Sequence, residues 1–255
     1  MNYLFAPWIS CLLLLQSTPF LDPHSPPFIV LWLVFSLPVI ALDVKIYGQW
    51  FTKGRKFLSV VANPTSLLSV LTNFAGARAA AKMGWKESAV CMFSLGMAHY
   101  LVLFVTLYQR LQGSNALPAM LRPAFFLFFA APSMASFTWA SISGSFDISC
   151  KMLFYLSLFL FASLVSRPTL FKRSMRKFNL AWWTFSLPLS IMALAATEYA
   201  QEVKGPISNV LMLCLCVVSS LVTLALLVYS VLNTVQLLPF HDPFLSSTSS
   251  SMDSC

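Results

Sequence analysis

The chain has 255 residues, of which 58% are hydrophobic and only 9% are charged. Soluble domains carry about 25% charged residues and cannot cover so much apolar surface, so this composition excludes a soluble fold and requires side chains that face lipid. The net charge of +8 comes mostly from short segments beside apolar runs, a pattern typical of membrane topology signals and not of a nucleic-acid surface.

Eight apolar segments approach the length of about 20 residues that crosses a hydrocarbon core. In chain order they are Tyr3–Phe20, Phe28–Tyr47, Phe57–Ala81, Ser88–Tyr108, Ala119–Ile142, Cys150–Ser166, Phe178–Ala200 and Ile207–Asn233. The third segment is the least apolar, since it contains Asn63, Asn73 and Arg78. The chain therefore predicts an all-α integral membrane domain at 1–235 and a Ser/Thr-rich cytoplasmic tail at 236–255, which we expect to be disordered.

Basic residues in the connections predict the orientation of these spans. One set of alternate connections carries Lys53, Arg55, Lys56, Arg110, Arg167, Lys172, Arg173, Arg176 and Lys177. The other set carries only Lys82, Lys86 and Lys204. The positive-inside rule places the first set and both termini in the cytoplasm, and this assignment requires the third span.

Odd-numbered and even-numbered spans differ in composition. The odd spans combine prolines with small or hydroxyl residues, among them Pro7, Pro64, Pro123, Pro132, Ser133, Ser136, Thr138 and Pro188. Proline frees backbone groups that need a neighbouring helix or a water-filled cavity, whereas purely apolar helices can face lipid. We predict helical hairpins that form an inner, pore-lining ring of odd spans and an outer ring of even spans. Tight packing without a pore is the alternative.

The chemistry of the sequence favours anions over catalysis. Catalytic motifs are missing, and the six cysteines and three histidines do not group, so we expect no enzyme, no metal and no cofactor. Acidic residues in the spans are confined to the ends, at Asp43 and Glu198, whereas a cation path normally contains embedded carboxylates. His99 is intramembrane and serves either helix packing or a proton path.

Cations near the span ends complete this interpretation. Arg78, Lys82 and Lys86 are candidates for one pore mouth and Arg167 for the other, although Arg167 is equally consistent with an ordinary topology charge. Ser133, Ser136 and Thr138 are the candidate pore-lining hydroxyls.

Long segments of the chain resemble the plant slow-type (S-type) anion channel family, which is related to bacterial tellurite-resistance and dicarboxylate-transport proteins. The similar segments include LDVKIYGQWF, ANPTSLLSVLTNFAGARAAAKMGW, HYLVLFVTLYQRL, FFAAPSMASFTWASISGSFD and KFNLAWWTFSLPLS. The resemblance implies a plasma-membrane channel for chloride and nitrate. It also implies a homotrimer whose subunits each contain a pore, and a fold of ten helices in five hairpins with odd helices lining the pore.

Two departures from the family pattern affect the functional hypothesis. The chain begins at the family's third helix, so we expect the first hairpin to be lacking. The family's gate motif resembles W-W-x-Y-x-F-P, and here Leu187 occupies the gate position before Pro188, with Phe185 in the preceding tyrosine position. Two other functions stay open: a non-conducting partner in a mixed trimer with a full-length channel, and a proton-coupled organic-acid transporter.

Overall fold

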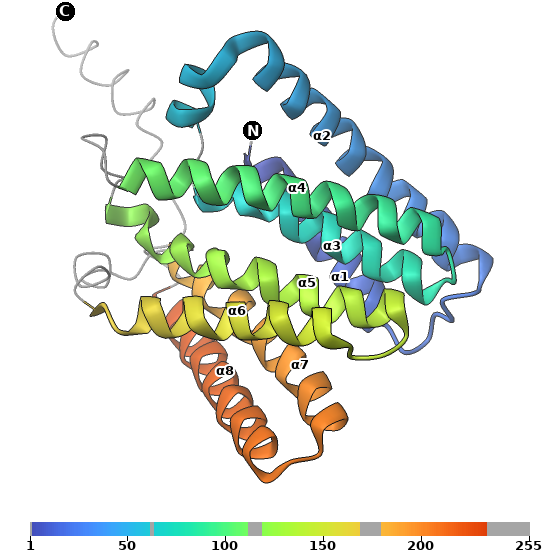
Figure 1. Cartoon of the computed structure of the whole chain (residues 1–255), viewed down its shortest axis with the longest axis vertical. Helices are drawn as coiled ribbons and strands as arrows, with labels where there is room; N and C mark the ends of the chain where they lie inside the picture. The colour runs from blue at the N-terminus through green and yellow to red at the C-terminus, as the bar shows by residue number, and fades with distance from the viewer. Residues whose placement is uncertain (1, 62–63, 112–118, 169–179, 234–255) are drawn as a thin grey trace, which may run out of the picture.

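A computed structural model of the chain describes residues 2–61, 64–111, 119–168 and 180–233. The described part is helical throughout, which confirms the predicted all-α membrane fold (Figure 1). Its α-helices are α1 (Ala6–Ser17), α2 (Pro26–Val61), α3 (Leu67–Lys82), α4 (Lys86–Leu111), α5 (Leu127–Ser143), α6 (Ile148–Val165), α7 (Ser186–Val203) and α8 (Pro206–Leu232). The predicted tail at 236–255 lies outside the described residues.

The helices form hairpins with one inner and one outer member, as predicted. The inner helices α1, α3, α5 and α7 contact one another in that order, and each of the outer helices α2, α4, α6 and α8 contacts the inner helix before it (Figure 1). Burial follows the same division: in an apolar window of 18 residues within Pro123–Ser143, around α5, 78% of the residues are buried, against 17% in such a window of α6 or α8. The small and hydroxyl residues of the odd spans therefore lie inside the bundle.

Helix length and apolarity differ between the two layers. Among the described residues, α2, α4, α6 and α8 contain stretches long and apolar enough to cross a membrane, as does Pro123–Ser143, which begins before α5 and includes it, and α1 is a shorter apolar helix. The inner helices α3 and α7 fall outside this set, because their sequences are rich in alanine and polar residues. Most side chains of α3 are nevertheless buried, since they face other helices and not lipid.

Each inner helix begins with a short 3₁₀ segment. These segments are η1 (Asn2–Phe5), η2 (Pro64–Ser66), η3 (Ala119–Phe126) and η6 (Leu180–Phe185). A proline lies within the segment or in the first turn of the following α-helix, where the absence of its N–H and its clash with the preceding turn oppose a continuous α-helix. The single spans predicted at Ala119–Ile142 and Phe178–Ala200 are thus divided into a 3₁₀ part and an α part.

The end of the second predicted span is wrong. We expected this span to end at Tyr47 and a loop with Lys53, Arg55 and Lys56 to follow, but α2 continues to Val61. It therefore includes Phe57, the predicted start of the third span. No proline occurs between Pro38 and Pro64, so no proline stops the helix where its apolar part ends. In Figure 1 this last part of α2 diverges from the other helices.

The α5–α6 connection is fixed by Asp147. Its Oδ1 accepts a hydrogen bond from the N–H of Cys150 and caps α6, while its Oδ2 accepts one from the indole N–H of Trp139 on α5 (3.0 Å each). Partial burial would raise the pKa of Asp147, but these hydrogen bonds outweigh it and lower the pKa. The cap is therefore present at neutral pH and weakens as the pH falls through this lowered pKa.

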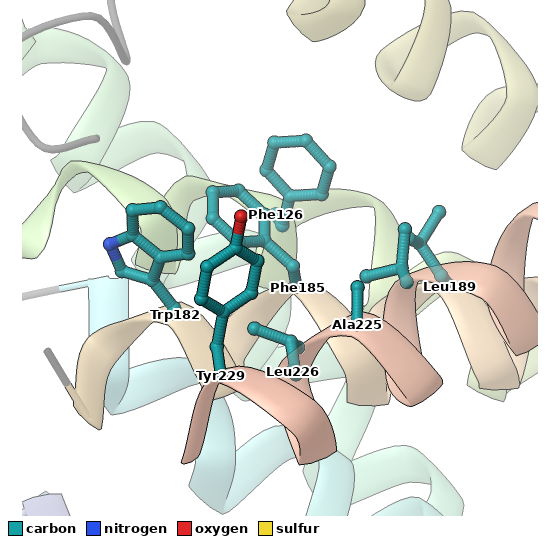
Figure 2. Close-up of a pocket in the computed structure, with 8 residues that line it drawn as sticks. Phe126, Trp182, Phe185, Leu189, Ala225, Leu226 and Tyr229 are labelled. Carbon is teal, nitrogen blue, oxygen red and sulfur yellow. The ribbon is translucent and has the colours of Figure 1, made fainter. Parts of the chain in front are cut away.

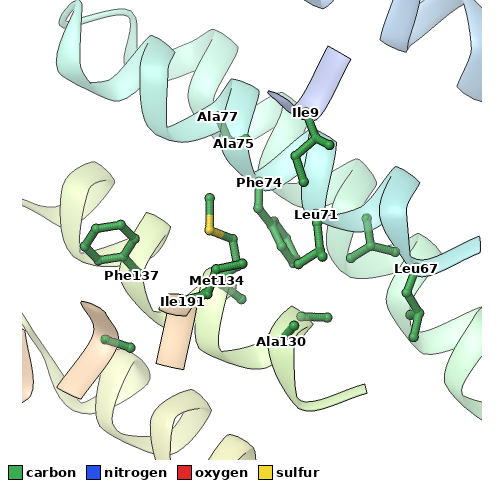
Figure 3. Packing of buried hydrophobic residues seen from close by; sticks show 14 of the residues in the cluster. Ile9, Leu67, Leu71, Phe74, Ala75, Ala77, Ala130, Met134, Phe137 and Ile191 are labelled. Atoms are coloured by element: carbon green, nitrogen blue, oxygen red, sulfur yellow. The ribbon is translucent and has the colours of Figure 1, made fainter. Parts of the chain in front are cut away.

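Close packing of α3 against its neighbours forms the centre of the bundle. Phe74 and Leu71 on α3 lie beside Ile9 of α1 and Met134 of α5 (Figure 3). Gly96 on α4 leaves space for the fully buried ring of Phe74, because a Cβ built at this glycine would lie 2.7 Å from a carbon of that ring. The glycine therefore permits the close approach of α3 and α4.

We predict that Gly96→Ala lowers the thermal unfolding midpoint of the detergent-purified protein, because the added methyl group must displace a ring that is packed on every side. Overpacking of this kind costs about 1–3 kcal/mol. Gly48→Ala is the matched control, since a Cβ there meets no atom within 4 Å. An unchanged midpoint for Gly96→Ala would show that Phe74 has room to move.

Candidate functional site

Arg78 marks the point where the inner helices converge toward their C-terminal ends. Its guanidinium carbon on α3 lies 3.6 Å from the centre of the Phe137 ring on α5, a cation–π contact. One of its Nη groups donates a hydrogen bond to the side-chain oxygen of Gln16 on α1 (3.2 Å). Glu198 on α7 interacts electrostatically with it. The structure thus brings four inner helices together around one half-buried cation.

The surroundings of Arg78 carry excess positive charge. Lys82, one turn further along α3, is half-buried and interacts electrostatically with both Arg78 and Glu198. Two cations therefore face one carboxylate, and the Nε of Arg78 has no hydrogen-bond partner. The sequence predicted Arg78 and Lys82 as a pore mouth but did not include Glu198, although its position near a span end was visible.

The opposite end of the inner helices is aromatic. Phe126 is the last residue of η3 and Phe185 the last of η6, so the two occupy equivalent positions in successive hairpins. Their rings meet edge to face with centres 4.6 Å apart, and Phe5 ends η1 in the same way. Phe126 and Phe185 also line an apolar cavity of about 290 Å³, together with α8 residues such as Tyr229 (Figure 2).

The two gate candidates lie in different surroundings. Phe185 is buried against Phe126, whereas Leu187 is half-buried and packs against the main hydrophobic cluster. Pro188 is buried in the first turn of α7. The N–H groups of a first turn have no partner within the helix, so the missing N–H of Pro188 costs α7 no backbone hydrogen bond. The assignments of Leu187 and Phe185 as gate residues stay predictions.

The predicted pore-lining hydroxyls join helices in this structure. Ser133 forms a hydrogen bond with Ser157 of α6, and Ser136 donates one to the carbonyl oxygen of Cys150 at the start of α6 (2.8 Å). Thr138 donates one to the carbonyl oxygen of Phe74 on α3 (3.2 Å). All three side chains are fully buried. These hydrogen bonds join α5 to α6 and α3, so helix pairing explains why the three hydroxyls are buried. A role of the hydroxyls in lining a pore stays a prediction.

Arg167 lies apart from the inner helices. It directly follows the outer helix α6 and is exposed, with its backbone N–H donating to the carbonyl oxygen of Leu164 (3.2 Å). The hairpin arrangement places it at the same end of the bundle as the 3₁₀ segments. Both alternatives for Arg167, a pore mouth or a topology charge, fit this position.

Comparison with known proteins identifies the family of this fold. The family model described as "voltage-dependent anion channel" matches residues 2–231, and the chain belongs to this family. It is therefore a multi-pass membrane protein.

Named relatives come from Arabidopsis thaliana. The chain is 56% identical to the S-type anion channel SLAH1 over 252 residues, which cover 99% of this chain and 65% of SLAH1. It is 54% identical to the S-type anion channel SLAH4, with coverage of 97% of this chain and 68% of SLAH4. Identity to the guard cell S-type anion channel SLAC1 is 43%, over 91% of this chain and 42% of that protein. The chain thus spans about two thirds of the length of SLAH1 and SLAH4.

The hydroxyl contacts of α5 generate a prediction about water access. In a cysteine-subtracted background, Ser136→Cys should resist a water-soluble thiol reagent, because its side chain faces the start of α6. Ser143→Cys, at the exposed end of α5, is the matched control and should react rapidly. Comparable reaction rates at the two positions would show that water reaches Ser136 and would favour pore lining over helix pairing.

Proposed function

We propose that the chain is an S-type anion channel subunit that passes chloride and nitrate across the plasma membrane along its inner helices. The observation that carries this proposal is the convergence of four inner helices on Arg78, a half-buried cation whose Nε is buried without a hydrogen-bond partner. The names of the relatives and the family support it.

The charge distribution along the inner helices suits anions. Carboxylates on α1, α3, α5 and α7 are limited to Glu198 and Glu202 near the end of α7. The opposite end presents the N-termini of all four inner helices, where the helix dipole is positive. An anion therefore meets cationic side chains at one end and helix N-termini at the other, and it meets no acidic side chain of these helices between the two ends.

Apolar outer helices and the extended inner row support assembly with other subunits in lipid. We propose a homotrimer, as the resemblance implies, or a mixed trimer with related channel subunits. The mixed form corresponds to the second candidate, a partner that does not conduct alone. The observation that favours this second candidate is that the described inner helices form a row, with α1 and α7 at its two ends. In a row, each end helix packs against one inner helix only. Current from the chain expressed alone, compared with co-expression, separates the two.

The third candidate, a proton-coupled organic-acid transporter, needs an embedded acid–base pair. Asp43 and His99 supply one, but they lie on α2 and α4, outside the inner row. Anion current that persists without a proton gradient would exclude obligatory coupling. Current that requires the gradient would favour this transporter.

The first functional prediction concerns Arg78. Arg78→Gln should lower anion conductance roughly twofold or more at low ionic strength, because the mouth loses the charge that concentrates anions. The loss should shrink at high salt, where screening weakens this attraction. Lys204→Gln is the control, since it removes an equal charge from an exposed position at the same end of the bundle. Equal effects of the two variants would mean that Arg78 acts only through net surface charge.

The second functional prediction concerns the gate. An apolar constriction blocks ions because it does not wet, so truncating the gate residue should increase resting anion current several-fold in voltage clamp. We expect this increase for Leu187→Ala and low current for Leu187→Phe. If Phe185 gates instead, Phe185→Ala opens the pore and Leu187→Ala does not. Unchanged current in both alanine variants, at normal surface amounts, would remove the gate from α7.

A further inference from the structure

A buried polar cluster lies between α2, α3 and α4, away from the inner path. Asp43 on α2, Asn73 on α3 and His99 on α4 are 2%, 0% and 1% exposed. The side-chain nitrogen of Asn73 donates a hydrogen bond to Oδ2 of Asp43 (2.6 Å), and Nδ1 of His99 lies 3.8 Å from Oδ1 of Asp43. Three consecutive helices thus contribute one polar side chain each to a site at membrane depth.

The remaining neighbours of this cluster leave Asp43 without a permanent countercharge. The rings of Tyr47 and Trp50 on α2 cover His99 with centres 5.4 and 5.0 Å away, and Ser69 on α3 is its nearest hydroxyl, 3.4 Å from the ring nitrogens. The titratable groups that face one another are therefore Asp43, Tyr47 and His99. In the described part of the chain, Asp43 forms no ion pair with a lysine or arginine.

Other charged or titratable groups nearby point elsewhere. Lys45 on α2 is exposed, on a different side of the helix from the buried Asp43. The hydroxyl of Tyr100 on α4 donates toward the carbonyl oxygen of Phe128 on α5 (3.4 Å). On α3, the groups that face the cluster are the neutral Asn73 and Ser69.

Several oxygen atoms in the cluster lack hydrogen-bond partners. Among the described residues these buried atoms include Oδ1 of Asp43, the hydroxyl of Tyr47 and Oδ1 of Asn73. A buried ionised carboxylate without a countercharge is strongly unfavourable in a membrane protein. One added proton removes this cost, whether it forms a carboxylic acid beside neutral imidazole or an imidazolium beside carboxylate, because the pair is then neutral overall.

A cavity adjoins the cluster. It has a volume of about 430 Å³ and lies between α2 and α4, where Asp43 and Tyr47 line it together with Gly48, Phe51 and Leu95. The glycine contributes no side chain, and a Cβ placed there would meet no atom within 4 Å. A space of this size is large enough for several water molecules. Its wall is largely apolar, and Oδ1 of Asp43 and the hydroxyl of Tyr47 are buried directly behind that wall.

We propose that Asp43 and His99 form an intramembrane proton-binding site that takes up a single proton from water through the cavity between α2 and α4. Asn73 positions the carboxylate, and Tyr47 and Trp50 separate the imidazole from lipid. Proton occupancy keeps α2 packed on α3 and α4, since an empty site leaves a buried negative charge at their junction. The site lies among outer helices, so this inference does not depend on the proposed anion path.

The stability of the protein as a function of pH tests this site. Above about pH 7.5, where free histidine and aspartate are almost fully deprotonated, only the folded chain keeps a proton at this site. The folding equilibrium should then weaken up to tenfold per pH unit until the site empties. Asp43→Asn removes the need for the proton and should abolish this pH dependence of the folding equilibrium. Asp22→Asn, in an exposed connection, should retain the pH dependence.

Thermal unfolding midpoints of the detergent-purified chain between pH 6.5 and 9 give the measurement. Parallel curves for wild type and Asp43→Asn would overturn the proposal. If Asp43→Asn does not fold, the infrared spectrum of the wild type at pH 7.5 decides. A protonated-carboxyl band or an imidazolium ring mode that disappears as the pH rises supports the site, and the absence of both overturns it.

Discussion

A helix in hydrocarbon gains little from burying apolar side chains against another helix, because lipid tails solvate them equally well. Close fit and interhelical hydrogen bonds must therefore hold the bundle together. Within the hairpins, Ser136 bonds to the first turn of α6, and Ser186 and Ser190 bond to Thr223 and Ser219 of α8 at 2.8 and 3.1 Å. Gly96 serves the same purpose between α3 and α4 by removing a side chain. The sorting into inner and outer helices depends on these contacts.

The same requirement explains why the two ends of the inner row differ. Prolines confine the 3₁₀ segments to one end, where aromatic rings such as Phe126 and Phe185 fill the space between helices that begin irregularly. At the other end the helices are regular, and Arg78 spans the gap between them with its ring contact to Phe137 and its bond to Gln16. The proposed path therefore has a polar, charged end and a dry, apolar end.

The sequence predicted the helical hairpins and the two layers, because proline and small residues separate the odd spans from the even ones. It failed at the end of α2, since hydropathy reports where lipid contact ends and helices extend beyond that point. It located Arg78 but not its partners Glu198 and Gln16, which depend on the register between helices far apart in the chain. Asp43 was placed near a span end, yet the longer α2 makes it an interior residue. An aspartate, an asparagine and a histidine in successive spans were the available signal.

The pairing of neighbours in sequence also bears on how the chain acquires its fold during synthesis. A short connection joins the two helices of each of the pairs α3–α4, α5–α6 and α7–α8. The contacts within each pair therefore have low sequence separation. A hairpin can close as soon as its second helix has left the ribosome, and its hydroxyl bonds are then complete. The contacts between inner helices need only two finished hairpins at a time. Assembly can thus proceed from the N-terminus, with each folded hairpin added to the hairpin before it.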